Sequence, residues 1–306
     1  MRETDLIARL LAPLATSRVA RGLTDDAAVL SPPLGRDLVF THDVLAAGVH
    51  YLPGDPPETV AAKLLAVNLS DLAAMGARPL GVLLGLGLSA AEDAAWLTAF
   101  TTGLGRGLDR WNVALWGGDT VRGLAAAVLG MTAVGQVEAG TALSRSGAQP
   151  GDDVWVSGTI GDAGLGLAIA KGDAPADAFL LNRFRRPEPR LALGRALVGV
   201  ASAAMDISDG LLLDATRLAA ASGVAMTIDL ARVPVSAAAA ARVVRDDAGL
   251  LGLASAGDDY ELLFTAPAGA APQGATRIGR VAAGAGLTVV GIGGAAIAPG
   301  RLGYEH

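Results

Sequence analysis

The chain has 306 residues, a net charge of −6 at neutral pH and no cysteine. With 52% hydrophobic and 18% charged residues, it has enough apolar material for a buried core and lacks the composition of a disordered chain. The negative charge argues against a nucleic-acid-binding protein. The absence of cysteine excludes disulfides, thiolate metal ligands and a cysteine nucleophile.

The first half of the chain predicts an α/β unit. Expected helices cover residues 3–14, 55–74 and 90–108, and expected strands cover 27–30, 38–40, 80–88, 113–116 and 125–137. The helix over 55–74 is expected to use Asp55 as its N-cap and to stop before Gly76. Two polar segments, Thr41-His42-Asp43 and Gly117-Gly118-Asp119-Thr120, are expected directly after strands.

A polar, turn-rich segment over residues 144–152 predicts a boundary, and a second α/β unit follows it. Its expected strands cover 153–157, 225–229 and 260–265, and its expected helices cover 163–171, 191–201 and 211–221. Two domains are therefore expected, residues 1–140 and 141–306, which are both of ordinary domain size.

The two ends of the chain favour a cytoplasmic protein with no membrane partner. Residues 1–5 carry acids where a signal peptide needs a basic region. The longest uncharged stretch, residues 281–300, is interrupted by glycine and proline, so it favours loops and short strands over a membrane span.

Aspartate accounts for 23 of the 30 acidic residues, and several stand in glycine-rich or turn-like segments. These segments are Thr24-Asp25-Asp26, Thr41-His42-Asp43, Asn68-Leu69-Ser70-Asp71, Gly117-Gly118-Asp119-Thr120, Asp206-Ile207-Ser208-Asp209-Gly210 and Gly257-Asp258-Asp259-Tyr260. Aspartate oxygens are ligands for hard cations such as Mg²⁺. Two carboxylates about 4 Å apart repel by roughly 4 kcal/mol at an effective dielectric constant of about 20, so a converging set implies bound metal. Metal beside glycine-rich turns indicates phosphate chemistry.

Each of these segments also has an ordinary structural interpretation. An ionised Asp71 on an apolar helix needs a metal, an arginine or Lys63 as a partner, unless it faces water. Gly158-Thr159-Ile160-Gly161 before a helix is compatible with a phosphate cradle, although such turns are common without a ligand. No Walker A loop, Gly-x-Gly-x-x-Gly or Gly-x-Ser-x-Gly pattern is present.

Four further side chains are candidates with an equally plain alternative. His42 and His50 lie close to an aspartate segment, but an isolated histidine is more often structural than a ligand. Arg145 lies in the polar segment and is either a phosphate clamp or a surface charge. Tyr304 either stacks on a ring or anchors the C-terminal tail.

Taken in order along the whole chain, seven segments resemble those of the thiamine-monophosphate kinase family. This family belongs to the ATP-binding superfamily of aminoimidazole ribonucleotide synthetase and selenophosphate synthetase. The matching segments are Gly22–Val29, Thr41–Tyr51, Ala66–Ala77, Gly117–Thr120, Leu143–Asp152, Asp206–Gly210 and Gly257–Leu262, and the tail Gly303–His306 is similar to the family's ending.

The resemblance implies transfer of the γ-phosphoryl group of ATP to thiamine monophosphate by a homodimer, with no covalent nucleophile or general base. It implies a two-domain fold similar to aminoimidazole ribonucleotide synthetase, with an N-terminal mixed sheet that carries helices on one face and pairs in the dimer, and a C-terminal α/β domain that completes the site. The implied Mg²⁺ ligands are Asp26, Thr41, His42, Asp43, Asp71, Asp119, Asp206 and Asp209. The implied ATP contacts are Gly118, Asp119, Arg145 and Ser208, and the implied substrate contacts are His50, Asp258 and Tyr304.

Three positions depart from the family pattern. Thr24 replaces a glycine, His42 replaces a small hydroxyl residue, and Asp258 replaces a glutamate. A metal contact at His42 is therefore expected from its backbone carbonyl. The remaining alternatives are another reaction of the superfamily, such as aminoimidazole ribonucleotide synthesis, and a non-catalytic nucleotide-binding regulator.

Overall fold

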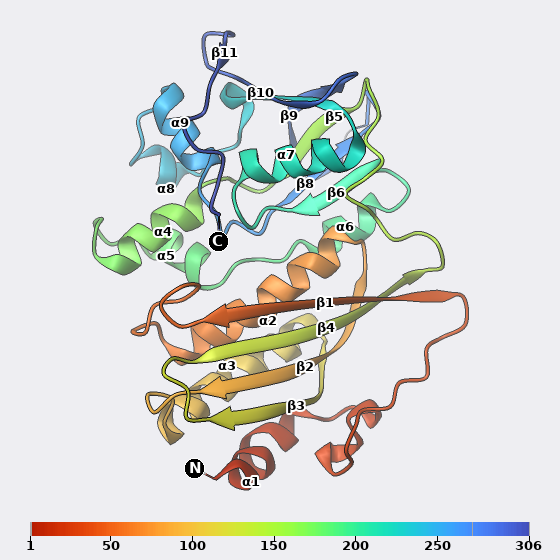
Figure 1. The fold of residues 1–306 in the computed structure, drawn as a ribbon, viewed down its shortest axis with the longest axis vertical. Coiled ribbons are helices and arrows are strands. Elements are labelled where there is room, and N and C mark those ends of the chain that lie inside the picture. Colours follow the sequence, from red (N-terminus) through yellow and green to blue (C-terminus); the bar gives the residue numbers. More distant parts are fainter. Residues whose placement is uncertain (1, 271, 306) are drawn as a thin grey trace. The chain divides into compact units, whose positions relative to one another are not determined.

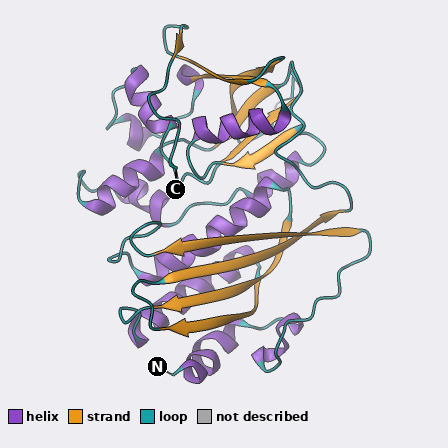
Figure 2. Ribbon diagram, in the orientation of Figure 1, coloured by secondary structure: helices purple, strands orange, loops and turns teal. Residues whose placement is uncertain are grey.

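The computed structural model describes residues 2–270 and 272–305, apart from the side chain of Glu3, so His306 of the family-like tail lies outside the described residues. The chain forms two compact units, Met1–Leu72 with Ala77–Gly140 and Ala73–Gly76 with Thr141–His306 (Figure 1). Each unit combines a sheet with helices, as the expected α/β class requires (Figure 2).

The first unit is built on a four-stranded mixed sheet with the order β1-β4-β2-β3. Its strands are β1 (Arg36–Ala46), β2 (Arg78–Leu88), β3 (Ala114–Arg122) and β4 (Val128–Glu138). The β2–β3 pair is parallel and the β1–β4 and β2–β4 pairs are antiparallel. The helices α2 (Pro57–Ala74) and α3 (Ala94–Trp111) lie on one face of this sheet (Figure 1).

The polar segments Thr41–Asp43 and Gly117–Thr120 lie inside strands, which corrects the expectation that they follow strands. Strand pairing uses backbone groups and therefore continues through polar side chains. In β1 the side chains alternate, so Thr41 and Asp43 face the helices while His42 is exposed on the opposite face.

The two helices follow the predicted pattern with shifted ends. α2 begins at Pro57, and the carboxylate of Asp55 accepts the N–H of Leu52 at 2.8 Å, so its expected role as an N-cap was wrong. α3 begins four residues later than expected because Asp93 caps it by accepting the N–H of Trp96 at 2.8 Å. α3 approaches α2 closely at Gly103, where a β-carbon would lie 2.5 Å from the Cα of Glu58.

The N-terminal segment departs most from the prediction. Instead of one helix over residues 3–14, the structure has α1 (Glu3–Leu6), a π-helical turn (Ile7–Leu11) and a 3₁₀ turn (Ala12–Leu14). Pro13 has no N–H to continue an α-helix. The strand expected over 27–30 is absent, because this segment pairs with no sheet edge and Val29 is left exposed.

The second unit is built on a seven-stranded mixed sheet with the order β11-β10-β7-β9-β5-β8-β6. Its strands are β5 (Asp153–Ser157), β6 (Ala203–Asp206), β7 (Ala225–Asp229), β8 (Leu262–Ala266), β9 (Ala275–Ala282), β10 (Gly286–Val290) and β11 (Ala296–Ile297). Strands β5 and β7 lie where the sequence predicts them. Strands β6, β9, β10 and β11 were not predicted, because short strands are recognisable only once their partners are known.

The helices of the second unit include three that were expected and three that were not. Expected were α4 (Asp162–Lys171), α6 (Leu191–Leu197) and α7 (Leu211–Ser222), and unexpected were α5 (Ala178–Arg185), α8 (Ala237–Ala240) and α9 (Asp247–Ala254). The hydrophobic core includes Ile207 and, from α7, Leu211 and Leu218. No helix within the described ranges has both the length and the apolar composition needed to cross a membrane.

The α4–α5 contact depends on a helical glycine and provides a test of this packing. A β-carbon at Gly166 of α4 would lie 2.1 Å from the carbonyl oxygen of Leu180 in α5, whereas Gly252 of α9 has open space. We expect Gly166→Ala to lower the free energy of unfolding by about 1–3 kcal/mol through overpacking. We expect Gly252→Ala to raise it by roughly 0.5–1 kcal/mol, because alanine favours the helix. Urea denaturation measures both, and equal effects would contradict the described packing.

Candidate active site

In the first unit, strand β1 and helix α2 bring two carboxylates together. Asn68 and Asp71 lie one turn apart on α2 and face Thr41 and Asp43 of β1. The Thr41 hydroxyl donates a hydrogen bond to the Asp71 carboxylate. The Asn68 side-chain oxygen accepts the Asp43 N–H at 3.0 Å, and its amide donates to the Leu64 carbonyl at 2.9 Å. Asn68 therefore links the backbone of β1 to α2. The sequence analysis did not assign this role.

Electrostatics makes this pair of carboxylates costly. Burial, and then the nearby charge of Asp71, raise the pKa of Asp43 to about 6 from an ordinary value of 3.8. Both causes disfavour the ionised form of Asp43. A hard cation would relieve both, and the donors offered here are carboxylate and hydroxyl oxygens, which Mg²⁺ prefers. The residues present therefore fit a magnesium ion.

The remaining predicted ligands of the first unit are not gathered around this pair. Across the described residues, no group of three histidine or acidic side chains is arranged to hold a metal. Asp26 is exposed in the segment before β1. Asp119 is exposed in β3, where its carboxylate accepts the N–H of Thr120 at 2.9 Å. Gly118, beside it, has a structural reason to be glycine, because a β-carbon would lie 2.0 Å from the Leu84 carbonyl oxygen.

The imidazole of His42 does not lie with the Asp43 carboxylate. It projects from the opposite face of the sheet, and its Nδ1 lies 2.9 Å from the Thr132 hydroxyl on the adjacent strand. Because neighbouring residues of a strand alternate between faces, a metal near Asp43 can be reached from His42 only through backbone atoms.

The loop after β1 fixes both the position and the tautomer of His50. Its Nδ1 accepts the N–H of Ala46 at 3.1 Å, so the ring hydrogen of this neutral imidazole is on Nε2. The Lys63 ammonium, which is buried in α2, donates to the His50 carbonyl at 2.9 Å. The Lys63 ammonium therefore holds the backbone of the loop that carries His50.

In the second unit, three segments that are distant in the sequence meet. The N–H of Asp258 donates to the Ser208 carbonyl at 2.8 Å, and the N–H of Tyr304 donates to the Asp209 carbonyl at 2.8 Å. Asp206 lies just before these residues, buried at the end of β6. The structure thus places the predicted nucleotide contact Ser208 beside the predicted substrate contacts Asp258 and Tyr304. Arg145 is exposed in the segment before β5.

Two residues missed by the sequence analysis hold the Ser208-Asp209 turn. The buried Asp214 carboxylate accepts the N–H groups of Ser208 at 3.1 Å and Asp209 at 3.0 Å. Arg217 donates to the carboxylates of both Asp214 and Asp209. Burial raises the pKa of Asp214, while these hydrogen bonds lower it. The available signal was an acidic residue in the first turn of the helix after Gly210, followed by arginine three residues later.

The glycine-rich turn before α4 is filled by the protein's own carboxylates, which excludes the phosphate cradle considered for it. The Asp259 carboxylate accepts the N–H groups of Gly161 at 2.7 Å and Ala163 at 3.3 Å. A β-carbon at Gly158 would lie 2.1 Å from an oxygen of Glu261. Burial raises the pKa of Asp259 to about 8 against the lowering effect of the two N–H groups and Arg183.

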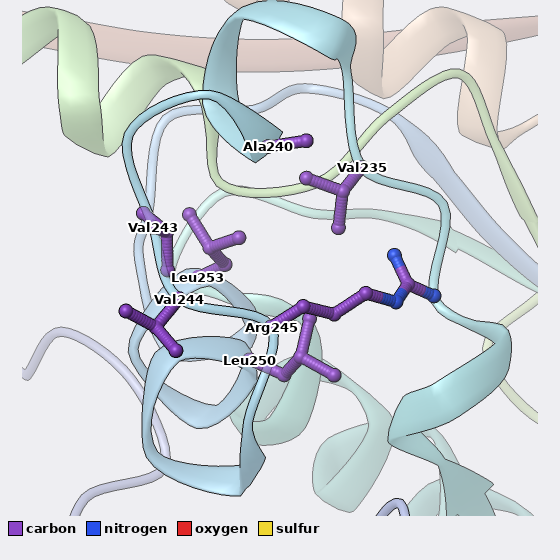
Figure 3. Close-up of a pocket in the computed structure, with 7 residues that line it drawn as sticks. All are labelled: Val235, Ala240, Val243, Val244, Arg245, Leu250 and Leu253. Carbon is purple, nitrogen blue, oxygen red and sulfur yellow. The ribbon is translucent and has the colours of Figure 1, made fainter.

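A pocket elsewhere in the second unit lacks the chemistry of a phosphate site. It has an empty volume of about 210 Å³ and is lined by Val235, Ala240, Val243, Val244, Arg245, Leu250 and Leu253 (Figure 3). Its lining is aliphatic apart from Arg245, whose guanidinium donates to the Ala231 carbonyl at 3.0 Å. No residue predicted to bind metal, nucleotide or substrate lines it.

Known proteins resemble the chain along its whole length. The AIR synthase related protein family matches with its N-terminal domain over residues 24–137 and its C-terminal domain over residues 149–292. Thiamine-monophosphate kinase of Caulobacter vibrioides is 42% identical, over 99% of this chain and 90% of that protein. The chain belongs to the thiamine-monophosphate kinase family.

Solved structures of this family share the fold. The crystal structure of thiamine-monophosphate kinase from Stenotrophomonas maltophilia K279a is 41% identical, with a TM-score of 0.82 over 91% of this chain and 93% of that one. The structure described as AaThiL complexed with AMPPCP and TMP is 31% identical, with a TM-score of 0.81 over 100% of this chain and 99% of that one. The thiamine-monophosphate kinase family expected from the sequence is confirmed.

If this family member keeps Asp43 as a metal ligand at the expense of stability, replacing it should stabilise the metal-free protein. At pH 8 without Mg²⁺ we expect Asp43→Asn to raise the free energy of unfolding by up to about 3 kcal/mol, since a pKa raised to about 6 from 3.8 is roughly two pH units at about 1.4 kcal/mol each. The folded protein binds this proton more tightly than the unfolded chain, so the parent loses stability as pH rises from about 4 to about 6. The advantage should therefore vanish near pH 4.

Urea denaturation at both pH values measures this difference. Asp109→Asn, at an exposed position of α3, is the control and should change stability by less than about 0.5 kcal/mol. Added Mg²⁺ should stabilise the parent more than the Asp43→Asn variant. A variant that is no more stable than the parent at pH 8 would refute the electrostatic description of this pair.

Proposed function

We propose that this protein transfers the γ-phosphoryl group of ATP to thiamine monophosphate, giving thiamine diphosphate and ADP. One observation carries the proposal: the chain aligns from end to end with AaThiL, a protein whose structure was solved with AMPPCP, an ATP analogue, and TMP. The name thiamine-monophosphate kinase, shared by relatives that are 42–44% identical, supports the same reaction.

The acceptor chemistry explains why no general base is required. A phosphate monoester has a second pKa near 6, so the attacking oxygen is already mostly ionised at neutral pH. Catalysis then depends on positioning the two phosphate groups and on neutralising their charge. In this proposal Asp43, Asp71 and Thr41 hold Mg²⁺ in the first unit. Magnesium would neutralise charge on the phosphate oxygens.

The other predicted ligands and contacts complete the proposal. Asp26, Asp119, Asp206, Asp209 and the backbone of His42 contribute to Mg²⁺ binding. Gly118, Asp119, Arg145 and Ser208 bind ATP, and His50, Asp258 and Tyr304 contact thiamine monophosphate. For His50 the donor is Nε2–H, because Nδ1 accepts the N–H of Ala46. The domains 1–140 and 141–306 both take part, and the protein acts in the cytoplasm, where it meets ATP.

We further propose that the enzyme is a homodimer whose N-terminal sheets pair. The sheet face opposite α2 and α3 exposes a set of large apolar side chains, namely Phe40, Val44, Leu83, Val121 and Val128. Such a patch is more typical of an interface than of a solvated surface. A second copy would cover it with the same residues in a two-fold arrangement.

The position of Asp119 favours a site shared between two copies. Asp43 lies in β1 and Asp119 in β3, at opposite edges of the sheet and on opposite faces. Three strand spacings of about 4.8 Å separate the edges by roughly 14 Å. Carboxylates that bind one ion, or two ions about 4 Å apart, must lie closer than that. Asp119 of the partner subunit would therefore serve the site that contains Asp43.

The reaction is tested by incubating the purified protein with ATP, Mg²⁺ and thiamine monophosphate. We expect thiamine diphosphate and ADP in equal amounts, detected by chromatography. Asp43→Asn and Asp119→Asn should each lower turnover at least about 100-fold while leaving the fold intact, because charge neutralisation at the phosphate is lost. Asp109→Asn should retain parental activity. A folded protein that binds ATP without forming thiamine diphosphate would favour a regulator or another reaction of the superfamily.

Mixing the two inactive variants tests the shared site. If Asp43 and Asp119 reach one site from different subunits, a refolded equal mixture of Asp43→Asn and Asp119→Asn should regain about a quarter of parental activity. Half of random dimers are mixed, and each mixed dimer keeps one of its two sites intact. Activity that stays at the level of the separate variants would mean that both carboxylates serve the same site from one chain.

A further inference from the structure

A buried ionic cluster lies directly behind the Asp258 turn and takes no part in the roles assigned above. Its centre is Glu261, which is fully buried immediately before β8. The Glu261 carboxylate accepts hydrogen bonds from Arg183 at 2.7 Å, from the Ser157 hydroxyl at 2.5 Å and from two nitrogens of Arg190. Four donors saturate the lone pairs of one carboxylate. We call Glu261, Arg183, Arg190 and Ser157 the Glu261 cluster.

A contribution to folding stability does not by itself explain the Glu261 cluster, because burying its charges costs free energy. Desolvating the Glu261 carboxylate and the Arg183 guanidinium costs several kcal/mol per ion, and a well-packed apolar substitute is often equally stable. The position of Glu261 also requires glycine at position 158, since a β-carbon at Gly158 would lie 2.1 Å from a Glu261 oxygen. Buried ion pairs of this kind are best attested as devices that fix one geometry.

The Glu261 cluster adjoins a strained backbone turn at Asp258–Tyr260. Asp258 has φ 69° and Tyr260 has φ 50°, and these two non-glycine residues lie in the left-handed region on either side of Asp259. Each such residue costs of order 1 kcal/mol or more and persists only where its surroundings enforce it. An observed outlier of this type is a reason to look for a function.

Hydrogen bonds from the Glu261 cluster and from a neighbouring segment hold this turn in its conformation. Arg183 bridges the Glu261 carboxylate and, at 3.2 Å, the backbone carbonyl of Asp259. The N–H groups of Asp258 and Tyr260 are fixed in turn on the carbonyls of Ser208 and Ile207, each at 2.8 Å. Arg183 thus holds the backbone of Asp259, which lies between the two left-handed residues. The backbone conformation of this turn sets the direction in which the Asp258 side chain leaves the chain.

We propose that Arg190 and Arg183 are positioning residues for thiamine monophosphate, acting through Glu261 to hold Asp258 in its left-handed conformation against the substrate. The inference rests on the proposed function, because Asp258 is a substrate contact only in that reaction. Arg190 gives the cleaner test because its side chain is 30% exposed, whereas that of Arg183 is 9% exposed and its loss leaves a larger internal void.

The test compares ligand binding in full-length variants by isothermal titration calorimetry. For Arg190→Met we expect the Kd of thiamine monophosphate to rise at least tenfold, while the Kd of ATP with Mg²⁺ stays within twofold. Arg190→Lys keeps the charge but loses the two-nitrogen contact, so an intermediate rise of threefold or more is expected. Arg277→Met is the matched control: Arg277 forms a comparable ion pair with Asp153, at 3.0 Å, and its loss should change neither Kd.

A double-mutant cycle separates positioning from general destabilisation. If Arg190 acts through Asp258, Arg190→Met should raise the Kd of thiamine monophosphate by less than twofold in an Asp258→Asn background. An unchanged Kd in a folded Arg190→Met or Arg190→Lys variant would overturn the proposal, as would an equal loss of ATP and substrate binding. Parental protein that binds thiamine monophosphate but forms no thiamine diphosphate would instead count against the proposed function.

Discussion

The energetic cost of burying carboxylates organises both units of this protein. In the second unit three buried acids are compensated internally: Asp214 by two N–H groups and Arg217, Asp259 by two N–H groups, and Glu261 by a hydroxyl and two arginines. In the first unit the two effects on the pKa of Asp43, burial and the charge of Asp71, both raise it, whereas hydrogen bonds and an arginine oppose the rise for Asp214 and Asp259. A cation contributes most to stability beside a buried carboxylate whose charge nothing else compensates. This difference marks Asp43 as a candidate metal ligand, and Asp214, Asp259 and Glu261 as structural acids.

The internally compensated acids still bear on the candidate site, because they shape its backbone. Asp214 holds the turn that carries Ser208 and Asp209, and the Glu261 cluster holds the turn that carries Asp258. The two turns are joined by the hydrogen bond from Asp258 to the Ser208 carbonyl, and the C-terminal tail joins them through Tyr304 and Asp209. In a reaction that depends on positioning and not on a base, such rigidity is the main contribution a protein can make.

The first unit contributes through its sheet. Asn68 ties α2 to the edge strand β1, so that Thr41 and Asp43 face Asp71 while His42 turns to the open face. Strand periodicity therefore divides the Thr-His-Asp segment into two chemically different surfaces. One surface presents oxygen ligands, and the other belongs to the apolar face that we propose a second copy covers.

The family, the α/β class and most of the long elements could be predicted from the amino-acid sequence, because ordered motifs and long hydrophobic patterns are local properties. Helix α7 and strands β5 and β7 lie where their patterns predicted, and α2 ends where predicted but begins at Pro57. The fold was needed to show that Thr41–Asp43 and Gly117–Thr120 lie within strands, since strand length depends on pairing with β4 and β2. It alone showed that the turn at Gly158 encloses Glu261 and Asp259 and not a phosphate, and that Lys63 holds His50. These are contacts between residues up to about a hundred positions apart, and no local pattern encodes which buried charge will meet which donor.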